Sequence, residues 1–175
     1  VVNYTGDTFT ADIMPESLEN TNLTKAAKGE KVNLEKPVKA EDFLGGHIVT
    51  GHIDGVGKVK KIYKEKNAHI LEIEINSEIE KYIVDKGSVT LNGVSLTVVD
   101  ISGNSLKVSL IPETWNQTNL HLIIIGSEVN IETDIIGKYV LKAAANYDLE
   151  SKNSSKIDQK MLERNGFLSR NNRKG

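Results

Sequence analysis

The sequence predicts an all-β protein that contains two copies of one small domain and ends in a helix. Three observations predict this: an internal repeat, short segments that alternate apolar and polar residues, and turn residues between those segments. Residues 1–37 align without a gap on residues 98–134, and 12 of the 37 positions are identical. The offset of 97 is too long for a solenoid unit and fits a small domain.

The repeat also predicts the domain boundaries. The first half of the second copy has no counterpart before Val1, so we expect the first copy to lack its amino-terminal half, as in a fragment or a trimmed product. The expected organisation is a truncated amino-terminal domain, a complete second domain, a helical segment and a disordered tail. These four parts cover residues 1–44, 45–136, 137–168 and 169–175.

Alternation of apolar and polar residues with a period of two predicts short, half-buried strands. Turn residues separate them, with Gly6, Gly103 and the pair Asn92-Gly93 at positions where a hairpin needs positive φ. Many short strands indicate a small barrel or sandwich, and a closed barrel is favoured because it exposes no sheet edge. The predicted strands are 88–91, 94–99, 105–111 and 128–132.

Three kinds of helix are expected between and after the strands. Ser77-Glu-Ile-Glu80 matches a capping box that opens a short helix through Tyr82 and Ile83, and Pro15 and Pro112 each begin a single helical turn. The segment 155–165 places apolar residues on one face and ends before Gly166. That face packs either on its own barrel or between subunits, and the sequence favours neither.

Composition excludes several functions. Lys and Arg total 22 against 24 Asp and Glu, for a net charge of −2, so no broad positive field attracts nucleic acid. No apolar run reaches the roughly 20 residues that span a bilayer, and no signal peptide is recognisable. We therefore expect a soluble, cytoplasmic protein without a membrane association. The absence of Cys excludes disulfides and thiolate catalysis.

The glycine-rich segment 45–57, GGHIVTGHIDGVG, is the most unusual stretch. It lacks the spacing of a dinucleotide-binding loop, and glycines at barrel corners and bulges are the simpler interpretation. His47 and His52 are five residues apart, which on a strand puts them on opposite faces. The other two histidines have no metal-ligand spacing either, so no metal site is expected.

Six motifs in one order resemble the riboflavin synthase α-chain family: DIMPESLENTNL, GEKVNLE, LGGHIVTGHIDGVG, KYIVDKGSVTLNGVSLTVVD, SLIPETWNQTNL and GSEVNIETDIIGKYV. The resemblance implies two tandem, six-stranded antiparallel barrels and a carboxy-terminal helix. It also implies a homotrimer assembled through those helices, with lumazine synthase as a candidate partner. The implied reaction transfers a four-carbon unit between two molecules of 6,7-dimethyl-8-ribityllumazine, giving riboflavin and 5-amino-6-ribitylaminouracil with no metal or organic cofactor.

The resemblance further implies which residues form the site. His52 is the expected proton carrier because imidazole titrates near neutral pH, Ser95 supplies a hydroxyl beside it, and Asp134 assists by charge or hydrogen bonding. The repeat independently pairs residues 12–17 with residues 109–114 as equivalent pocket blocks. The expected substrate-binding residues are Asp12, Ile13, Met14, Pro15, Glu16, Ser17, Gly51, Ile53, Lys86, Leu96, Thr97, Ser109, Leu110, Ile111, Pro112, Glu113 and Thr114.

Two related pockets suit a reaction between two copies of one substrate. Holding both molecules in place can lower the barrier by about 7 to 11 kcal/mol when alignment is good. The alternative is a non-catalytic antenna protein of the same duplicated fold that binds lumazine or flavin without turnover. The combination of His52, Ser95 and Lys86 favours the enzyme.

Overall fold

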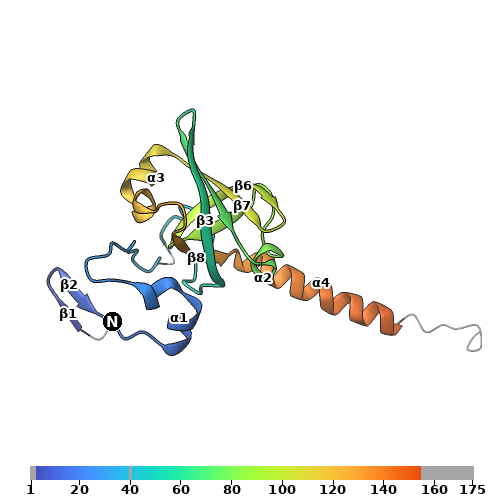
Figure 1. Cartoon of the computed structure of the whole chain (residues 1–175). Helices are drawn as coiled ribbons and strands as arrows, with labels where there is room; N and C mark the ends of the chain where they lie inside the picture. Colours follow the sequence, from blue (N-terminus) through green and yellow to red (C-terminus); the bar gives the residue numbers. More distant parts are fainter. Residues whose placement is uncertain (1–2, 40, 155–175) are drawn as a thin grey trace, which may run out of the picture. The chain divides into compact units, whose positions relative to one another are not determined.

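The computed structural model describes residues 3–39 and 41–154 (Figure 1). One compact unit extends to Lys138 and contains all the strands, and the rest of the last helix belongs to a second unit. The chain begins with a short hairpin of β1 (Asn3–Thr5) and β2 (Thr8–Thr10). A helical turn α1 (Pro15–Asn20) and a 3-10 turn η1 (Asn22–Lys25) follow it.

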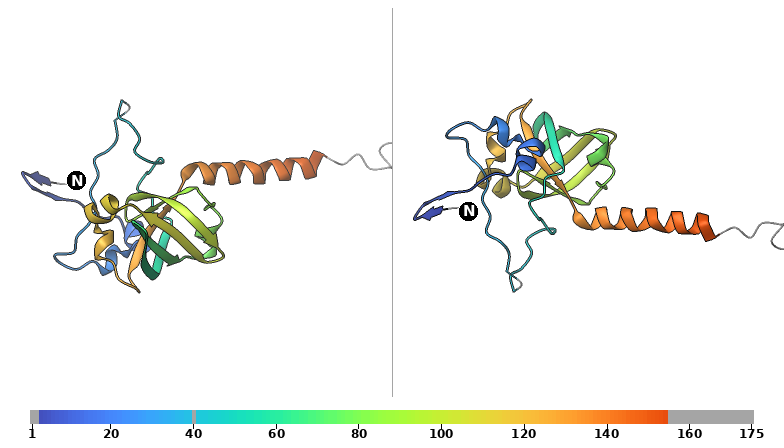
Figure 2. Two further views of the ribbon diagram at one scale, coloured as in Figure 1. Left: turned by 90° about the horizontal axis from the view of Figure 1, so that it is seen from above. Right: turned by 90° about the horizontal axis from the view of Figure 1, so that it is seen from below.

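Six antiparallel strands then form a closed barrel in the order β3-β4-β7-β6-β5-β8 (Figure 2). This confirms a closed barrel rather than a sandwich for the second domain. The barrel core consists of aliphatic side chains that alternate along the strands with outward-facing polar residues. The strands are β3 (Gly55–Glu65), β4 (Ala68–Glu74), β5 (Ser88–Leu91), β6 (Val94–Ser102), β7 (Ser105–Leu110) and β8 (Glu128–Thr133).

The predicted turns are where the sequence indicated. Asn92 and Gly93 have φ of 48° and 82° between β5 and β6, as a type I′ hairpin requires. Gly6 and Gly103 have φ of 57° and 54° in their hairpins. The strand β3 was not predicted, because charged residues interrupt the apolar pattern along much of it. The strand β4 was not predicted either, although its second half alternates apolar and acidic residues.

The helix predicted to begin at Ser77 differs from the structure in its end and in its cap, because α2 (Ser77–Glu80) ends at Glu80 and not at Ile83. This helix is capped by Asn76 and not by Ser77, because the Asn76 side chain accepts a hydrogen bond from Ile79 N at 2.9 Å. Pro112 begins α3 (Pro112–Gln117), which η2 (Asn119–Leu122) follows. The last helix, α4 (Ile135–Ser154), begins close to the expected helical segment. The helix predicted over 155–165 lies outside the described residues.

Several elements occur twice at the offset of the sequence repeat. The bounds of α1 and α3 differ by 97 residues, and so do those of η1 and η2. The hairpins correspond too, because Asn3 pairs with Thr10 in one and Asp100 with Lys107 in the other. The same local sequence pattern therefore forms the same local structure in both places.

Asparagines join the amino-terminal segment to the barrel in matched pairs. Asn22 N donates to Asn130 Oδ1 at 2.8 Å, and Asn119 N donates to Asn33 Oδ1 at 2.8 Å. Asn22 is related to Asn119, and Asn33 to Asn130, by the same offset of 97. The side-chain amides of Asn22 and Asn119 then donate to two backbone carbonyls that again differ by 97 residues, those of Glu128 and Lys31.

Candidate functional site

Three polar residues form a row across the outer surface of the barrel. Thr90 on β5 lies opposite Glu132 on β8 and opposite Ser95 on β6. Directly opposed residues of antiparallel strands project from the same face of the sheet. The neighbours of Thr90 in sequence, Val89 and Leu91, are fully buried in the barrel core, so this row points outward.

The glycine-rich segment crosses this row as an extended strap, defined here as residues 46–54. At its start, His47 Nδ1 lies 2.8 Å from Ser95 Oγ, and His47 Nε2 lies 3.1 Å from Thr90 Oγ1. Gly46 is required here, because a Cβ at that position would lie 2.4 Å from Ser95 Oγ. The strap therefore covers Thr90, which is 0% exposed although it faces outward.

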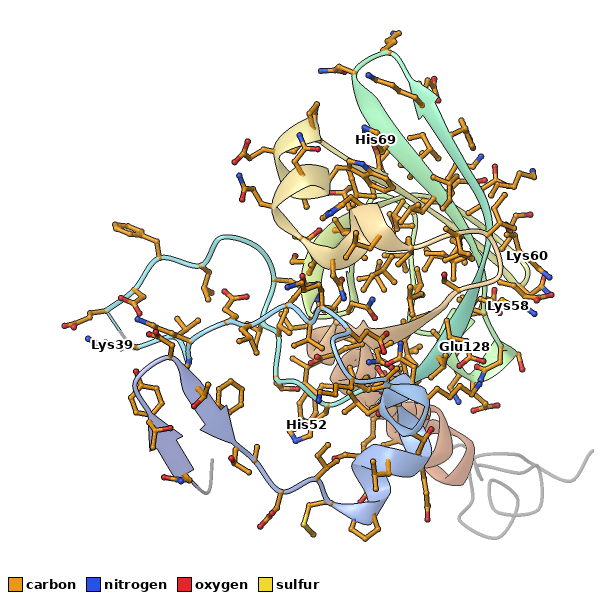
Figure 3. All side chains as sticks on the ribbon, turned by 60° about the vertical axis from the view of Figure 1, so that its left-hand side comes forward. Lys39, His52, Lys58, Lys60, His69 and Glu128 are labelled. Atoms are coloured by element: carbon orange, nitrogen blue, oxygen red, sulfur yellow. The ribbon has the colours of Figure 1, made fainter. Side chains whose placement is uncertain are left out.

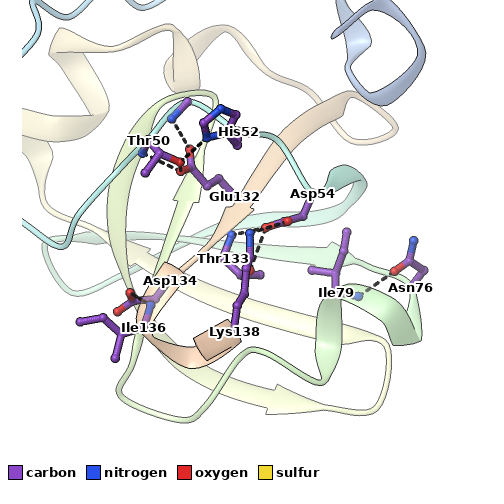
Figure 4. Close-up of polar contacts among 11 residues, drawn as sticks. Thr50, His52, Asp54, Asn76, Ile79, Glu132, Thr133, Asp134, Ile136 and Lys138 are labelled. Atoms are coloured by element: carbon purple, nitrogen blue, oxygen red, sulfur yellow. Dashed lines mark hydrogen bonds and ion pairs between the residues drawn. The ribbon is translucent and has the colours of Figure 1, made fainter. Parts of the chain in front are cut away.

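Glu132 fixes the middle of the strap. Its side chain is 2% exposed, and Oε1 accepts hydrogen bonds from Thr50 N at 2.7 Å and Thr50 Oγ1 at 2.8 Å. Oε2 accepts from Gly51 N at 3.0 Å. Gly51 has φ of 80°, a conformation that strongly favours glycine. Two backbone amides and one hydroxyl thus satisfy a buried carboxyl group (Figure 4).

Asp54 fixes the end of the strap by the reverse arrangement. Here the carboxylate belongs to the strap, and Oδ2 accepts from Thr133 N and Thr133 Oγ1, each at 2.8 Å. Lys138 Nζ lies 2.6 Å from Asp54 Oδ1, and Asp54 N donates to Ile131 O at 2.8 Å. Consecutive residues of β8 therefore hold the strap on both sides of His52.

His52 is exposed between these two fixed points (Figures 3 and 4). Its Nδ1 lies 2.9 Å from Thr50 Oγ1. Within the described part of the chain, Nε2 of His52 has no hydrogen-bond partner. The structure pairs Ser95 with His47, whereas the sequence interpretation put His52 beside it. The strap is not a strand, so the spacing of five residues does not by itself determine which way either histidine faces.

Five of the other predicted residues lie on β6, on β7 or just before β5. Thr97 and Ser109 are directly paired across β6 and β7, and Lys86 is exposed beside them, with its N donating to Val98 O at 3.0 Å. Leu96 and Leu110 lie in the barrel core, 6% and 1% exposed.

Asp134 contacts the helix that follows it. Its Oδ1 accepts a hydrogen bond from Ile136 N at 3.0 Å, in the first turn of α4. Any chemical role of this carboxylate would have to coexist with this capping interaction.

The two predicted pocket blocks occupy equivalent places in the fold. Residues 12–17 and 109–114 each lead from a strand into a helical turn that begins at proline. Met14 is 69% exposed and Ile111 62% exposed, so each block presents a large apolar side chain to solvent immediately before its helix. Such a side chain is available to contact an aromatic ligand.

Two open cavities of about 500 and 520 Å³ lie elsewhere, between residues 19–33 and the barrel. One is lined by charged side chains that include Lys58 and Glu128, and the other by the paired asparagines. The predicted site residues line neither cavity. Among the described residues, no cluster of three or more His, Asp or Glu side chains could hold a metal ion. None of the described helices has the length and apolar character needed to cross a membrane.

Sequence reasoning missed Thr50, Glu132 and the contacts of His47. Glu132 looks like an ordinary polar position on an alternating strand, because its neighbours Ile131 and Thr133 do not reveal that the strap covers it. A local signal did exist for the strap: the glycines at 46 and 51 indicate close approach and positive φ.

Comparison with known proteins assigns the family. The model of the lumazine binding domain matches residues 1–37 and 50–134. A riboflavin synthase of Actinobacillus pleuropneumoniae is 44% identical over 140 residues, which is 80% of this chain and 65% of that protein. The riboflavin synthase of Bacillus subtilis is 39% identical over 167 residues, which is 95% of this chain and 77% of that protein.

Solved structures give the same result for the fold. The structure of LumP complexed with riboflavin has a TM-score of 0.62 and 30% identity, covering 67% of this chain and 64% of that one. LumP complexed with 6,7-dimethyl-8-(1'-D-ribityl) lumazine has a TM-score of 0.60 and 28% identity, covering 69% and 64%. The barrel, the motifs and these likenesses together show that the chain belongs to the lumazine-binding-domain family that includes riboflavin synthase.

Proposed function

We propose that this chain belongs to a riboflavin synthase, a transferase that converts two molecules of 6,7-dimethyl-8-ribityllumazine into riboflavin and 5-amino-6-ribitylaminouracil. The observation that carries this proposal is the 39% identity to a riboflavin synthase across 95% of the chain. The match to the lumazine binding domain supports the substrate class. The reaction needs a base that removes a proton from the methyl group at ring carbon 7, and a polar group at that carbon.

His52 is our candidate for the proton transfer. It is exposed, its backbone is held between Gly51 and Asp54, and its Nε2 points away from the hydrogen bond that Nδ1 makes with Thr50. Ser95 is our candidate for the polar group, with its hydroxyl oriented by His47. Asp134 is our third candidate catalytic residue. It lies two residues after Glu132, which fixes the middle of the strap.

Two equivalent substrate pockets would follow from the repeat. The blocks 12–17 and 109–114 have the same local structure, and exchanged asparagine contacts relate their domains by an approximate twofold arrangement. We infer that residues 1–44 are part of a second barrel equivalent to the complete one. We also infer a homotrimer formed through the carboxy-terminal helix, in which pockets of neighbouring subunits face each other, in the cytoplasm and with lumazine synthase as a candidate partner.

A non-catalytic lumazine or flavin carrier is the second candidate function. The likeness to LumP favours it, because the LumP structures contain 6,7-dimethyl-8-(1'-D-ribityl) lumazine, riboflavin or flavin mononucleotide. A carrier and an enzyme of this family would share the barrel and the ligand pocket. They differ in whether the bound lumazine reacts, so only turnover separates them.

The test measures binding and turnover in the same samples. We expect 6,7-dimethyl-8-ribityllumazine to be consumed with formation of riboflavin, and His52→Ala to lower kcat about 100-fold or more while affinity changes less. His121→Ala is the matched control, since His121 is exposed and its hydrogen bond among the described residues is to Thr118 O, at the start of its own 3-10 turn. Binding without turnover in the trimeric protein would contradict the enzyme and support the carrier. No binding at millimolar ligand would contradict both.

A further inference from the structure

Glu132, Thr50 and His52 form a continuous chain of hydrogen bonds from the barrel to the exposed imidazole. Glu132 Oε1 lies 2.8 Å from Thr50 Oγ1, and Thr50 Oγ1 lies 2.9 Å from His52 Nδ1 (Figure 4). The first member is buried and the last is exposed. The chain therefore connects a buried carboxylate of β8 to the side chain that we propose to carry the proton.

The direction of these hydrogen bonds follows from the donors available. A carboxylate only accepts, so the Thr50 hydroxyl donates its single hydrogen to Glu132. The Thr50 oxygen can then only accept from His52, which requires the hydrogen of the imidazole to be on Nδ1. A neutral imidazole with hydrogen on Nδ1 has its lone pair on Nε2. That nitrogen has no partner among the described residues.

We propose that Glu132 is a positioning residue that acts through Thr50 to hold neutral His52 as the Nδ1–H tautomer, leaving Nε2 as the nitrogen that accepts the substrate proton. This inference rests on the proposed function for its kinetic consequence, while the tautomer is a property of the protein alone. Both residues lie within the family motifs, but neither is among the site residues that the resemblance implied.

The backbone contacts explain why this arrangement is rigid. Glu132 also accepts from Thr50 N and Gly51 N, so it holds both the peptide backbone and the hydroxyl of Thr50. Asp54 is joined to Thr133 and Lys138 on the other side of His52. With the backbone fixed on both sides, one hydroxyl suffices to orient the ring.

Replacing Thr50 gives the cleanest test, because this residue is exposed and its variants should fold. Long-range proton–nitrogen spectra of the 175-residue chain, recorded where the imidazole is neutral, distinguish the two tautomers. His52→Asn assigns the signal. We expect the Nδ1–H tautomer in the unmodified protein and in Thr50→Ser, which keeps the hydroxyl. Thr50→Val, which has the same shape without the hydroxyl, should lose the preference for the Nδ1–H tautomer.

Glu132→Gln provides a second variant. A glutamine NH2 group at either oxygen position would face a backbone N–H, that of Thr50 or that of Gly51, so this variant should loosen the strap and lower the population of the Nδ1–H tautomer. If this variant fails to fold, Thr50→Val still decides. An Nε2–H tautomer in the unmodified protein, or an unchanged tautomer in Thr50→Val, would overturn the proposal.

The kinetic measurement separates this proposal from the proposed function. We expect Thr50→Val to lower kcat about tenfold or more with KM within about twofold, and Thr50→Ser to stay within about twofold on both. A protein that shows the expected tautomers but no turnover contradicts the proposed function and leaves the tautomer assignment intact. Normal turnover by Thr50→Val with a changed tautomer would overturn the positioning role alone.

Discussion

The amino-terminal segment and the barrel contain the same local structures with very different burial. Phe9 on β2 is 47% exposed, whereas Leu106, the equivalent residue on β7, is 0% exposed. Ile13 is 48% exposed and its equivalent Leu110 is 1% exposed. The hairpins that carry Phe9 and Leu106 nevertheless have the same register and the same glycine turn.

The difference comes from neighbouring strands. Among the described residues, β1 and β2 pair only with each other, while β6 and β7 also pair with β5 and β4. A two-stranded hairpin has little apolar surface to bury, and a closed barrel buries one whole face of every strand. Local sequence thus sets turns and register, and strand neighbours set burial.

The largest expected effect comes from Phe9 and Leu106, which occupy equivalent positions on their strands. Leu106→Ala should lower the free energy of unfolding by about 2 to 5 kcal/mol, because it leaves a cavity in a closed core. Phe9→Ala should cost well under half of that, since Phe9 is already half-exposed. Urea unfolding of both variants tests this. Equal losses would mean that Phe9 is as buried in solution as Leu106.

Equivalent turn glycines should give the next effect. Gly103→Ala puts a side chain at a φ of 54° and should destabilise the barrel by about 1 to 2 kcal/mol. Gly6→Ala imposes the same local strain at φ of 57°, but we expect little change in global unfolding because few contacts depend on that hairpin. Thermal unfolding of the two variants tests this. A larger fall in Tm for Gly6→Ala than for Gly103→Ala would contradict it.

The matched asparagines allow a test of the contact between the regions. Removing the side-chain acceptor should lower the free energy of local opening by about 1 kcal/mol. Amide exchange that requires this opening should then be about fivefold faster. Asn130→Ala should accelerate exchange at Asn22 N, and Asn33→Ala should accelerate exchange at Asn119 N. Hydrogen exchange read residue by residue checks this, and a crossed or uniform response would contradict the pairing.

The smallest effect concerns the ion pair between exposed Lys61 and half-buried Glu72 in the β3–β4 hairpin, which has no counterpart among the described residues of the amino-terminal segment. The hydrogen bond from Lys61 holds the pKa of Glu72 below its usual value of 4.5, and Lys107 adds to this. A carboxyl group whose pKa is lower in the folded state stabilises the protein at pH values above its unfolded-state pKa. This stabilisation is lost as the pH falls through the folded-state pKa.

Lys61→Met should therefore raise the pKa of Glu72 toward the usual value, as followed by NMR of the carboxyl carbon. The stability difference between this variant and the parent should shrink below about pH 4. Lys64→Met is the matched control on the same strand, since Lys64 makes no ion pair among the described residues. A Glu72 pKa that does not respond to Lys61→Met would contradict the pairing.

Much of the fold was predictable because its signals are local. Alternation predicted β5, β6, β7 and β8 within one or two residues, except that β6 extends further, and Asn92-Gly93 predicted the turn between β5 and β6. Pro112 predicted the start of α3. The strand β3 escaped prediction because only the part that faces the core is apolar, and its bulge between Val59 and Lys61 breaks the alternation.

The candidate site was predictable in part. Motifs directed attention to His52, Ser95 and the glycine-rich segment, but nothing in the chain's local pattern indicates that Ser95 contacts His47. That contact joins residues 48 positions apart, and it forms because the strap crosses a row of outward side chains on three strands.

By itself the sequence determined the repeat, the turns, the strand faces and the family motifs, since these depend on neighbouring residues and on backbone conformations that only some residue types adopt. Tertiary structure alone decided which polar groups meet. The carboxyl group of Glu132 is buried only because the strap lies over it, and the strap lies there because Glu132 and Thr133 hold it on both sides of His52. Such mutual dependence between distant segments leaves no periodic signal, because each hydrogen bond requires the barrel to be closed first.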